Sequence, residues 1–156
     1  RWKYWLGGSK KMKLNEFISL DSIHVDVDVD SKKNLFKCVS NIFSKNDTDK
    51  ATIVTEKLNE RERLGSTGVG NGVAIPHSKI SYIQKTKVIL LKLKSSIDFS
   101  ASDNKYVDLV FVILAPKNCQ SEHLLVLSSI SSFVRDDSQL PELALHLCNG
   151  QRDENY

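Results

Sequence analysis

The residues of this chain best suited to chemistry lie together in the stretch ERERLGSTGVGNGVAIPHSK, which runs from Glu60 to Lys79. Four glycines crowd its middle, and the apolar run Val73–Ile75 then leads to Pro76 and His77. Glycine lets the backbone approach a ligand closely, so we expect this loop to present N–H groups to an anion. Because neutral imidazole is a nucleophile at physiological pH, the pattern favours a histidine that accepts a phosphoryl group.

Two nucleotide-binding motifs can be excluded from the same stretch. A P-loop requires lysine directly after its last glycine, and no glycine here is followed by lysine. The dinucleotide motif Gly-x-Gly-x-x-Gly would begin at Gly68 and require glycine at position 73, which is Val73. The glycine-rich loop therefore does not predict nucleotide binding.

Arg61 is the candidate for holding the oxygens of a phosphoryl group, since a guanidinium stays charged and can bind two oxygens at once. The alternative is a solvated charge on a helix, and the nearby Arg63 keeps that alternative open. The hydroxyls of Ser66 and Thr67 either add donors to the site or satisfy the loop itself.

Composition limits the remaining function classes. The chain has 156 residues, of which 40% are hydrophobic and 26% charged, with a formal net charge of +3. So small a charge argues for neither a nucleic-acid partner nor a membrane surface, and no apolar run is long enough for membrane insertion. Three dispersed cysteines without Cys-x-x-Cys spacing suit a reducing cytoplasm.

We predict no cofactor and no metal site. The acidic series Asp26–Asp30 resembles the start of a calcium loop, but Ser31 and Lys37 stand where glycine and glutamate are required. A solvated strand face explains this series better. The four histidines and three cysteines are too dispersed for a zinc site, and we interpret His24 and His146 as surface or structural residues.

Hydrophobic periodicity predicts helices alternating with strands, an α/β pattern in which helices cover both faces of a sheet. The expected strands are Ile23–Asp30, Val73–Ile75, Val88–Leu91 and Val107–Ala115. One expected helix follows Ser31 as its N-cap, and a second spans Asp49–Arg63 with Gly65 as the stop signal. A third begins at Ser121, and a fourth spans Leu140–Leu147.

The run from Arg61 to Lys79 resembles the signature of IIA proteins of the bacterial phosphoenolpyruvate-dependent phosphotransferase system, in the mannitol/fructose class. The wording GSTGVGNGVAIPH is most similar to the nitrogen-branch regulatory type, and Ser78 departs from the usual glycine. The resemblance implies a mixed β-sheet sandwiched between helices in three layers. It also implies that His77 carries the phosphoryl group, with Arg61 and, through Glu122-His123-Leu124, His123 beside it.

What the resemblance implies about function is a phosphotransferase with a phosphohistidine intermediate. The donor would be a histidine-phosphorylated carrier protein, and the regulatory targets would include potassium-transport or sensor proteins. The alternative is a fructose- or mannitol-type component that passes the phosphate to a IIB protein, and a fold kept only as a scaffold is a further possibility. We expect a cytoplasmic protein with one domain over residues 12–156, preceded by upstream or added residues 1–11 that are disordered.

Overall fold

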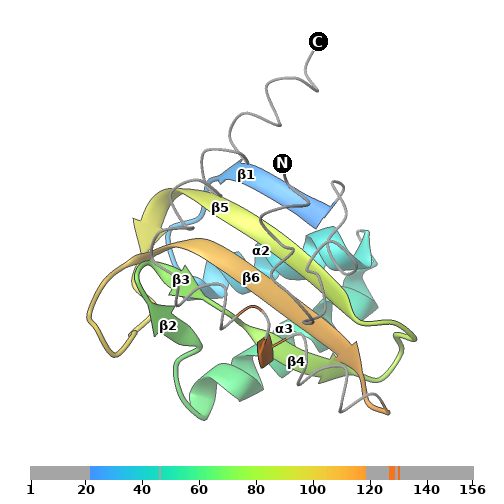
Figure 1. The fold of residues 1–156 in the computed structure, drawn as a ribbon. Helices are drawn as coiled ribbons and strands as arrows, with labels where there is room; N and C mark the ends of the chain where they lie inside the picture. The colour runs from blue at the N-terminus through green and yellow to red at the C-terminus, as the bar shows by residue number, and fades with distance from the viewer. Residues whose placement is uncertain (1–21, 46, 119–126, 129, 131–156) are drawn as a thin grey trace, which may run out of the picture.

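The structure, a computed structural model, describes residues 22–45, 47–118, 127, 128 and 130. These residues form a six-stranded mixed sheet in the order β1-β5-β6-β3-β2, with β4 also paired to β6 (Figure 1). The strands are β1 (Ile23–Val27), β2 (Gly68–Gly70), β3 (Val73–Ala74), β4 (His77–Ile80), β5 (Lys87–Ile97) and β6 (Val107–Pro116). The two helices are α2 (Lys32–Ser44) and α3 (Thr48–Arg63), and both lie on one side of the sheet in Figure 1.

The central pair of strands, β5 and β6, is antiparallel, whereas β1 runs parallel to β5 and both β3 and β4 run parallel to β6. The predicted mixed sheet is therefore confirmed. Alternate residues of the central strands point to opposite faces, and both sets are buried: Ile89 and Val112 on the helix side, Val88 and Phe111 on the other. A sheet covered on both faces explains the nearly continuous apolar sequence of these strands.

Both helices begin at side chains that cap their first turn. Ser31 is extended and its hydroxyl accepts a hydrogen bond from the amide of Asn34, as the sequence predicted. Asp47 does the same for α3 through the amide of Lys50, so α3 begins slightly before the predicted position. At its other end α3 stops at Arg63, and that boundary sets the position of the charged residues in its last turn.

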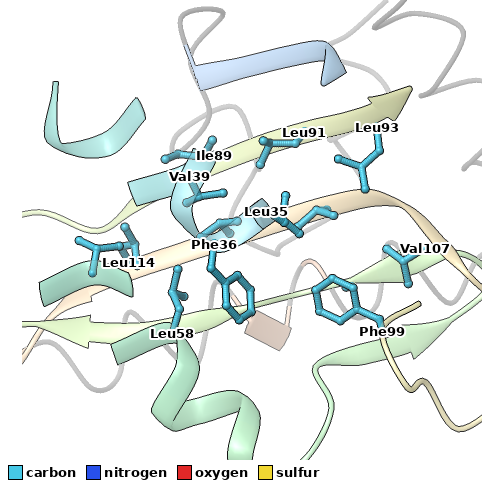
Figure 2. Close-up of a cluster of buried hydrophobic side chains, with 14 of the residues drawn as sticks. Leu35, Phe36, Val39, Leu58, Ile89, Leu91, Leu93, Phe99, Val107 and Leu114 are labelled. Carbon is cyan, nitrogen blue, oxygen red and sulfur yellow. The ribbon is translucent and has the colours of Figure 1, made fainter. Parts of the chain in front are cut away.

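The core lies between the two helices and the sheet (Figure 2). Leu35, Phe36 and Val39 of α2 are fully buried there together with Leu58 of α3. The Phe36 and Phe99 rings meet edge to face, with centroids 6.2 Å apart. This packing fixes the helices on the sheet, so the C-terminal turn of α3 is held at a defined position beside β4.

The first strand is shorter than predicted. Alternation favoured a strand through Asp30, but β1 ends at Val27, and its register with β5 shifts between His24 and Val27. Asp26, whose φ of 52° is left-handed, lies within this shift and interrupts the extended conformation there. The predicted solvated face is confirmed in its acidic residues, because Asp26, Asp28 and Asp30 are all exposed.

The glycine-rich stretch forms a hairpin. Strands β2 and β3 are antiparallel and are joined by Asn71 and Gly72, with φ of 57° and 78°, the positive values that a type I′ turn requires. Strand β3 ends at Ala74, and pairing with β6 resumes at His77 after Pro76. We predicted one strand over Val73–Ile75 ending at this proline; the structure has a shorter strand and then a second one that begins with the histidine.

The third and fourth predicted helices, from Ser121 and over Leu140–Leu147, lie almost entirely outside the described residues, although Leu127, Ser128 and Ile130 are helical and Ile130 is buried. In the part of the chain that the structure describes, no helix is long and apolar enough to cross a membrane.

Candidate active site

His77 is the first residue of β4, directly after the break that separates β3 from β4, and its ring is held by the backbone of this break. Nδ1 of His77 is 2.8 Å from the carbonyl oxygen of Ile75. A carbonyl oxygen only accepts hydrogen bonds, so Nδ1 carries the proton and Nε2 has the lone pair. This tautomer makes Nε2 the nucleophilic atom of the ring.

Arg61 reaches the same ring from the last turn of α3. Its Nε donates to Nε2 of His77 at 3.2 Å, and its Nη1 donates to the carbonyl oxygen of Gly65 at 2.9 Å. Arg63, the alternative considered from the sequence, is exposed. Of the two arginines, the structure therefore brings Arg61 to the histidine.

The environment of His77 favours a neutral imidazole. Burial lowers the pKa of His77 below its ordinary value, and the positive charge of Arg61 lowers it further. The hydrogen bond to the Ile75 carbonyl and the negative charge of Glu62 act in the opposite direction, and the net effect is a lowered pKa. At neutral pH Nε2 therefore keeps its lone pair, which accepts the hydrogen bond from Arg61 in this structure.

The loop amides differ from our expectation. We expected backbone N–H groups of the glycine-rich loop to face an anion, but several already donate within the protein. The amide of Thr67 donates to the carboxylate of Glu62, that of Gly68 to the hydroxyl of Ser66, and that of Asn71 to Asp103. In this stretch the glycines serve the geometry of the hairpin, and Arg61 supplies the positive charge next to the nucleophile.

The two loop hydroxyls are engaged in the same way. The Ser66 hydroxyl donates to the carbonyl oxygen of Phe99, and the Thr67 hydroxyl donates to Glu62 at 2.7 Å. Of the two interpretations left open by the sequence, the structure matches the one in which these side chains satisfy the loop.

Sequence reasoning missed Glu62 and Lys32. The carboxylate of Glu62 lies 2.8 Å from Nζ of Lys32, which comes from the first turn of α2, and its side chain is only 7% exposed. In the sequence Glu62 is one of four consecutive charged residues, and no spacing distinguishes it from Glu60. The predicted N-cap of α2 places Lys32 in the first turn of that helix, and the predicted end of α3 places Glu62 in its last turn, but neither prediction shows that the two side chains meet.

The third predicted site residue, His123, lies outside the described residues, as does His146. Within the described ranges, no group of three or more histidine, cysteine, aspartate or glutamate residues is arranged to hold a metal ion.

Comparison with known proteins identifies the class. The family model for the phosphoenolpyruvate-dependent sugar phosphotransferase system, EIIA 2, matches residues 16–147. The chain therefore belongs to the type 2 EIIA family of the phosphotransferase system. This agrees with the fold and with a histidine and an arginine in contact at the edge of the sheet.

The relatives identify the branch of that family. The chain is 37% identical to a nitrogen regulatory protein of Pseudomonas aeruginosa over 125 residues, which cover 79% of this chain and 80% of the relative. The crystal structure of nitrogen regulatory protein IIA-Ntr from Neisseria meningitidis matches with a TM-score of 0.76 and 34% identity, covering 86% of this chain and 89% of that one. The chain is a homologue of these nitrogen regulatory IIA proteins.

A more distant structure shares the fold. Enzyme IIA-Mtl of Escherichia coli, solved in complex with phosphorylated enzyme IIB-Mtl, matches with a TM-score of 0.66 at 20% identity, covering 85% of this chain and 97% of that one. The predicted mannitol-IIA-like fold is thereby confirmed.

Proposed function

We propose that this protein accepts a phosphoryl group on Nε2 of His77 from a histidine-phosphorylated carrier protein. The observation that carries the proposal is the hydrogen bond from Nδ1 of His77 to the carbonyl of Ile75, which leaves the lone pair on Nε2. Membership of the EIIA family supports phosphoryl transfer as the reaction.

The transfer exchanges one N–P bond for another. Nε2 of His77 attacks the phosphorus, the N–P bond of the carrier breaks, and the carrier's imidazole keeps the electron pair of that bond. Arg61 donates to Nε2 in the described state, so its guanidinium must turn away from this atom as the phosphoryl group arrives. From its place beside the ring it then binds the phosphoryl oxygens and offsets their charge.

His123 completes the proposed site by analogy with the family, as a donor to a phosphoryl oxygen or a support for the ring of His77. We further propose that residues 12–156 act as one IIA domain in the cytoplasm, since the family model spans most of this range.

We propose a regulatory role for the phosphorylated protein, because its relatives at 34% and 37% identity are nitrogen regulatory proteins. Phosphorylation adds close to two negative charges at His77 and changes the electrostatics of the surface around it. Target proteins, such as potassium-transport or sensor proteins, would then distinguish the two states by charge.

The test is phosphorylation by purified upstream phosphotransferase proteins with labelled phosphoenolpyruvate. We expect one label per chain, lost in His77→Ala and retained in His24→Ala, which removes a histidine of β1. Stoichiometric labelling of His77→Ala would overturn the assignment. A second step adds a mannitol- or fructose-type IIB protein: label that stays on His77 supports the regulator, whereas label that moves to IIB makes the protein a sugar-transport component.

A further inference from the structure

The last turn of α3 carries two glutamates in very different surroundings. The Glu60 side chain is 58% exposed and forms an ion pair with Lys57 of its own helix, at 3.3 Å. Glu62 is almost fully buried and makes contacts to two separate segments. One carboxylate oxygen binds Nζ of Lys32 at 2.8 Å and the amide of Thr67 at 3.1 Å, and the other accepts the Thr67 hydroxyl. A buried carboxylate with so many partners fixes the position of the groups it binds.

From Glu62 a continuous series of hydrogen bonds leads to the proposed nucleophile. The amide of Thr67 donates to Glu62, and the carbonyl of Thr67 accepts from the amide of Ile75 at 2.9 Å. The carbonyl of Ile75 in turn accepts from Nδ1 of His77 at 2.8 Å. The N–H and the C=O of one residue belong to different peptide groups, so this series fixes the geometry of the ring mechanically. The charge of Glu62 acts on the ring directly through space and raises the pKa of His77.

Lys32 connects Glu62 to a third segment of the chain. Its Nζ also donates to the carbonyl oxygen of Phe99 at 3.1 Å and lies 4.8 Å from the centre of the Phe99 ring. The Ser66 hydroxyl donates to the same Phe99 carbonyl. The loop that leads to the histidine is thus attached both to Glu62 and to the segment containing Phe99.

We propose that Glu62, held in place by Lys32, is a positioning residue for phosphoryl transfer, because it orients the His77 ring and its tautomer through Thr67 and Ile75. This inference rests on the proposed function of His77. Glu62 itself does not reach Nε2; it acts through the backbone that Nδ1 binds.

The adjacent residues Arg61 and Glu62 therefore act on the two different nitrogen atoms of the His77 ring. Arg61 contacts Nε2, where the phosphoryl group arrives, and Glu62 supports Nδ1 on the opposite side of the ring. These are the charged groups on α3 that act on His77: the positive one lowers the pKa of His77 and the negative one raises it. Glu62 thereby keeps the ring basic enough to be a good nucleophile although it is partly buried.

The experiment compares Glu62→Gln with Glu60→Gln, which removes the same charge from the same helix turn. Glutamine retains an acceptor oxygen for Thr67 but loses the charge that pairs with Lys32 and raises the pKa of His77. We expect the rate of phosphorylation to fall by roughly tenfold or more in Glu62→Gln, as for other losses of alignment. The pKa of His77, followed by NMR titration of the ring, should move further down in Glu62→Gln and stay at its wild-type value in Glu60→Gln.

A second pair of variants keeps the inference testable if Glu62→Gln does not fold. Lys32→Met removes the charge but retains a long apolar side chain next to the Phe99 ring. The control is Lys33→Met, which removes the charge of the neighbouring, exposed lysine. We expect slower phosphorylation in Lys32→Met and a wild-type rate in Lys33→Met. Rates and titrations of the Glu62 and Lys32 variants that match their controls would overturn the inference.

The two proposals fail in different ways. If the wild-type protein takes no label at His77, the proposed function is wrong. The titration needs no phosphoryl donor, so a His77 pKa that is unchanged in Glu62→Gln would contradict the positioning role even where wild-type labelling succeeds.

Discussion

Gly68 leaves no room for a methyl group, although its backbone conformation suits any residue. An ideal Cβ on Gly68 would lie 2.8 Å from Cβ of Ala101 and 3.3 Å from Cα of Ala101. The closer contact is about 0.6 Å shorter than the lower limit of ordinary contact, 3.4 Å. The φ of Gly68 is not among the positive values, so space alone decides the effect of Gly68→Ala.

The magnitude follows from two opposing contributions. Overpacking of this kind costs about 1–3 kcal/mol. Replacing glycine by alanine at a permitted φ returns about 0.4–1 kcal/mol, because the unfolded chain loses conformational freedom. We therefore expect Gly68→Ala to lower the free energy of unfolding by roughly 1–2 kcal/mol, which for a chain of this length lowers Tm by about 2–8 °C.

The assay is urea and thermal unfolding of the wild type, Gly68→Ala, Ala101→Gly and the double variant. Ala101→Gly alone should cost about 0.5–1 kcal/mol, from the added freedom of the unfolded chain. In the double variant the clash between the two Cβ atoms is absent, so its loss should be smaller than the sum of the single losses by at least about 0.5 kcal/mol. Strictly additive losses would refute the reasoning, because they would show that Cβ at position 68 does not meet Ala101.

Two further predictions concern the site and the core. Because burial lowers the pKa of His77, the unfolded chain binds a proton first as the pH falls below about 6.5, and the free energy of unfolding falls from there to the native pKa. Urea unfolding at several pH values should show a shallower fall of the free energy of unfolding in His77→Gln, with His24, whose pKa is also lowered by burial, as a further contribution. Equal slopes in the wild type and His77→Gln would contradict the lowered pKa of His77. Phe36→Ala should lower the free energy of unfolding by roughly 3–5 kcal/mol, since its ring is fully buried against Phe99, and Phe43→Ala, at a half-buried position, by clearly less. Similar losses in these two variants would show that the core is not centred on Phe36.

The helices and central strands were predictable because their signals are local. Ser31 caps α2 through an amide three residues away, and the apolar run of β6 identifies a central strand without any knowledge of its neighbours. The first strand was predicted too long, because the alternation of apolar and acidic residues continues to Asp30 although the strand ends at Val27. The left-handed φ of Asp26 interrupts the strand one residue before its end at Val27, and no residue type in the series predicts this interruption.

The geometry of the glycine-rich loop differs from the prediction, because the loop forms a hairpin and several of its amides donate within the protein. Glycine is compatible with an anion-binding loop and with a tight hairpin, but the Asn71-Gly72 dipeptide is a local signal for a type I′ hairpin turn that the sequence interpretation missed. The Asn71-Gly72 turn joins β2 to β3 in the hairpin, and β3 then pairs with β6, which brings Val73 beside Leu109. Once Thr67 and Gly68 are bonded within the protein, their amides are not the groups that meet an anion.

The sequence by itself determined the family, the two helices, the central strands and the identity of His77 as the proposed nucleophile, since these depend on local patterns and on a specific signature. Only the tertiary structure decided which atom of His77 has the lone pair, that the predicted Arg61 contacts this atom, and that Glu62 contacts both Lys32 and the loop before His77. Lys32 and Glu62 are 30 residues apart, and the loop joins Phe99 from 33 residues away. Contacts at such separations arise from the packing of helices on the sheet, and no local spacing encodes them.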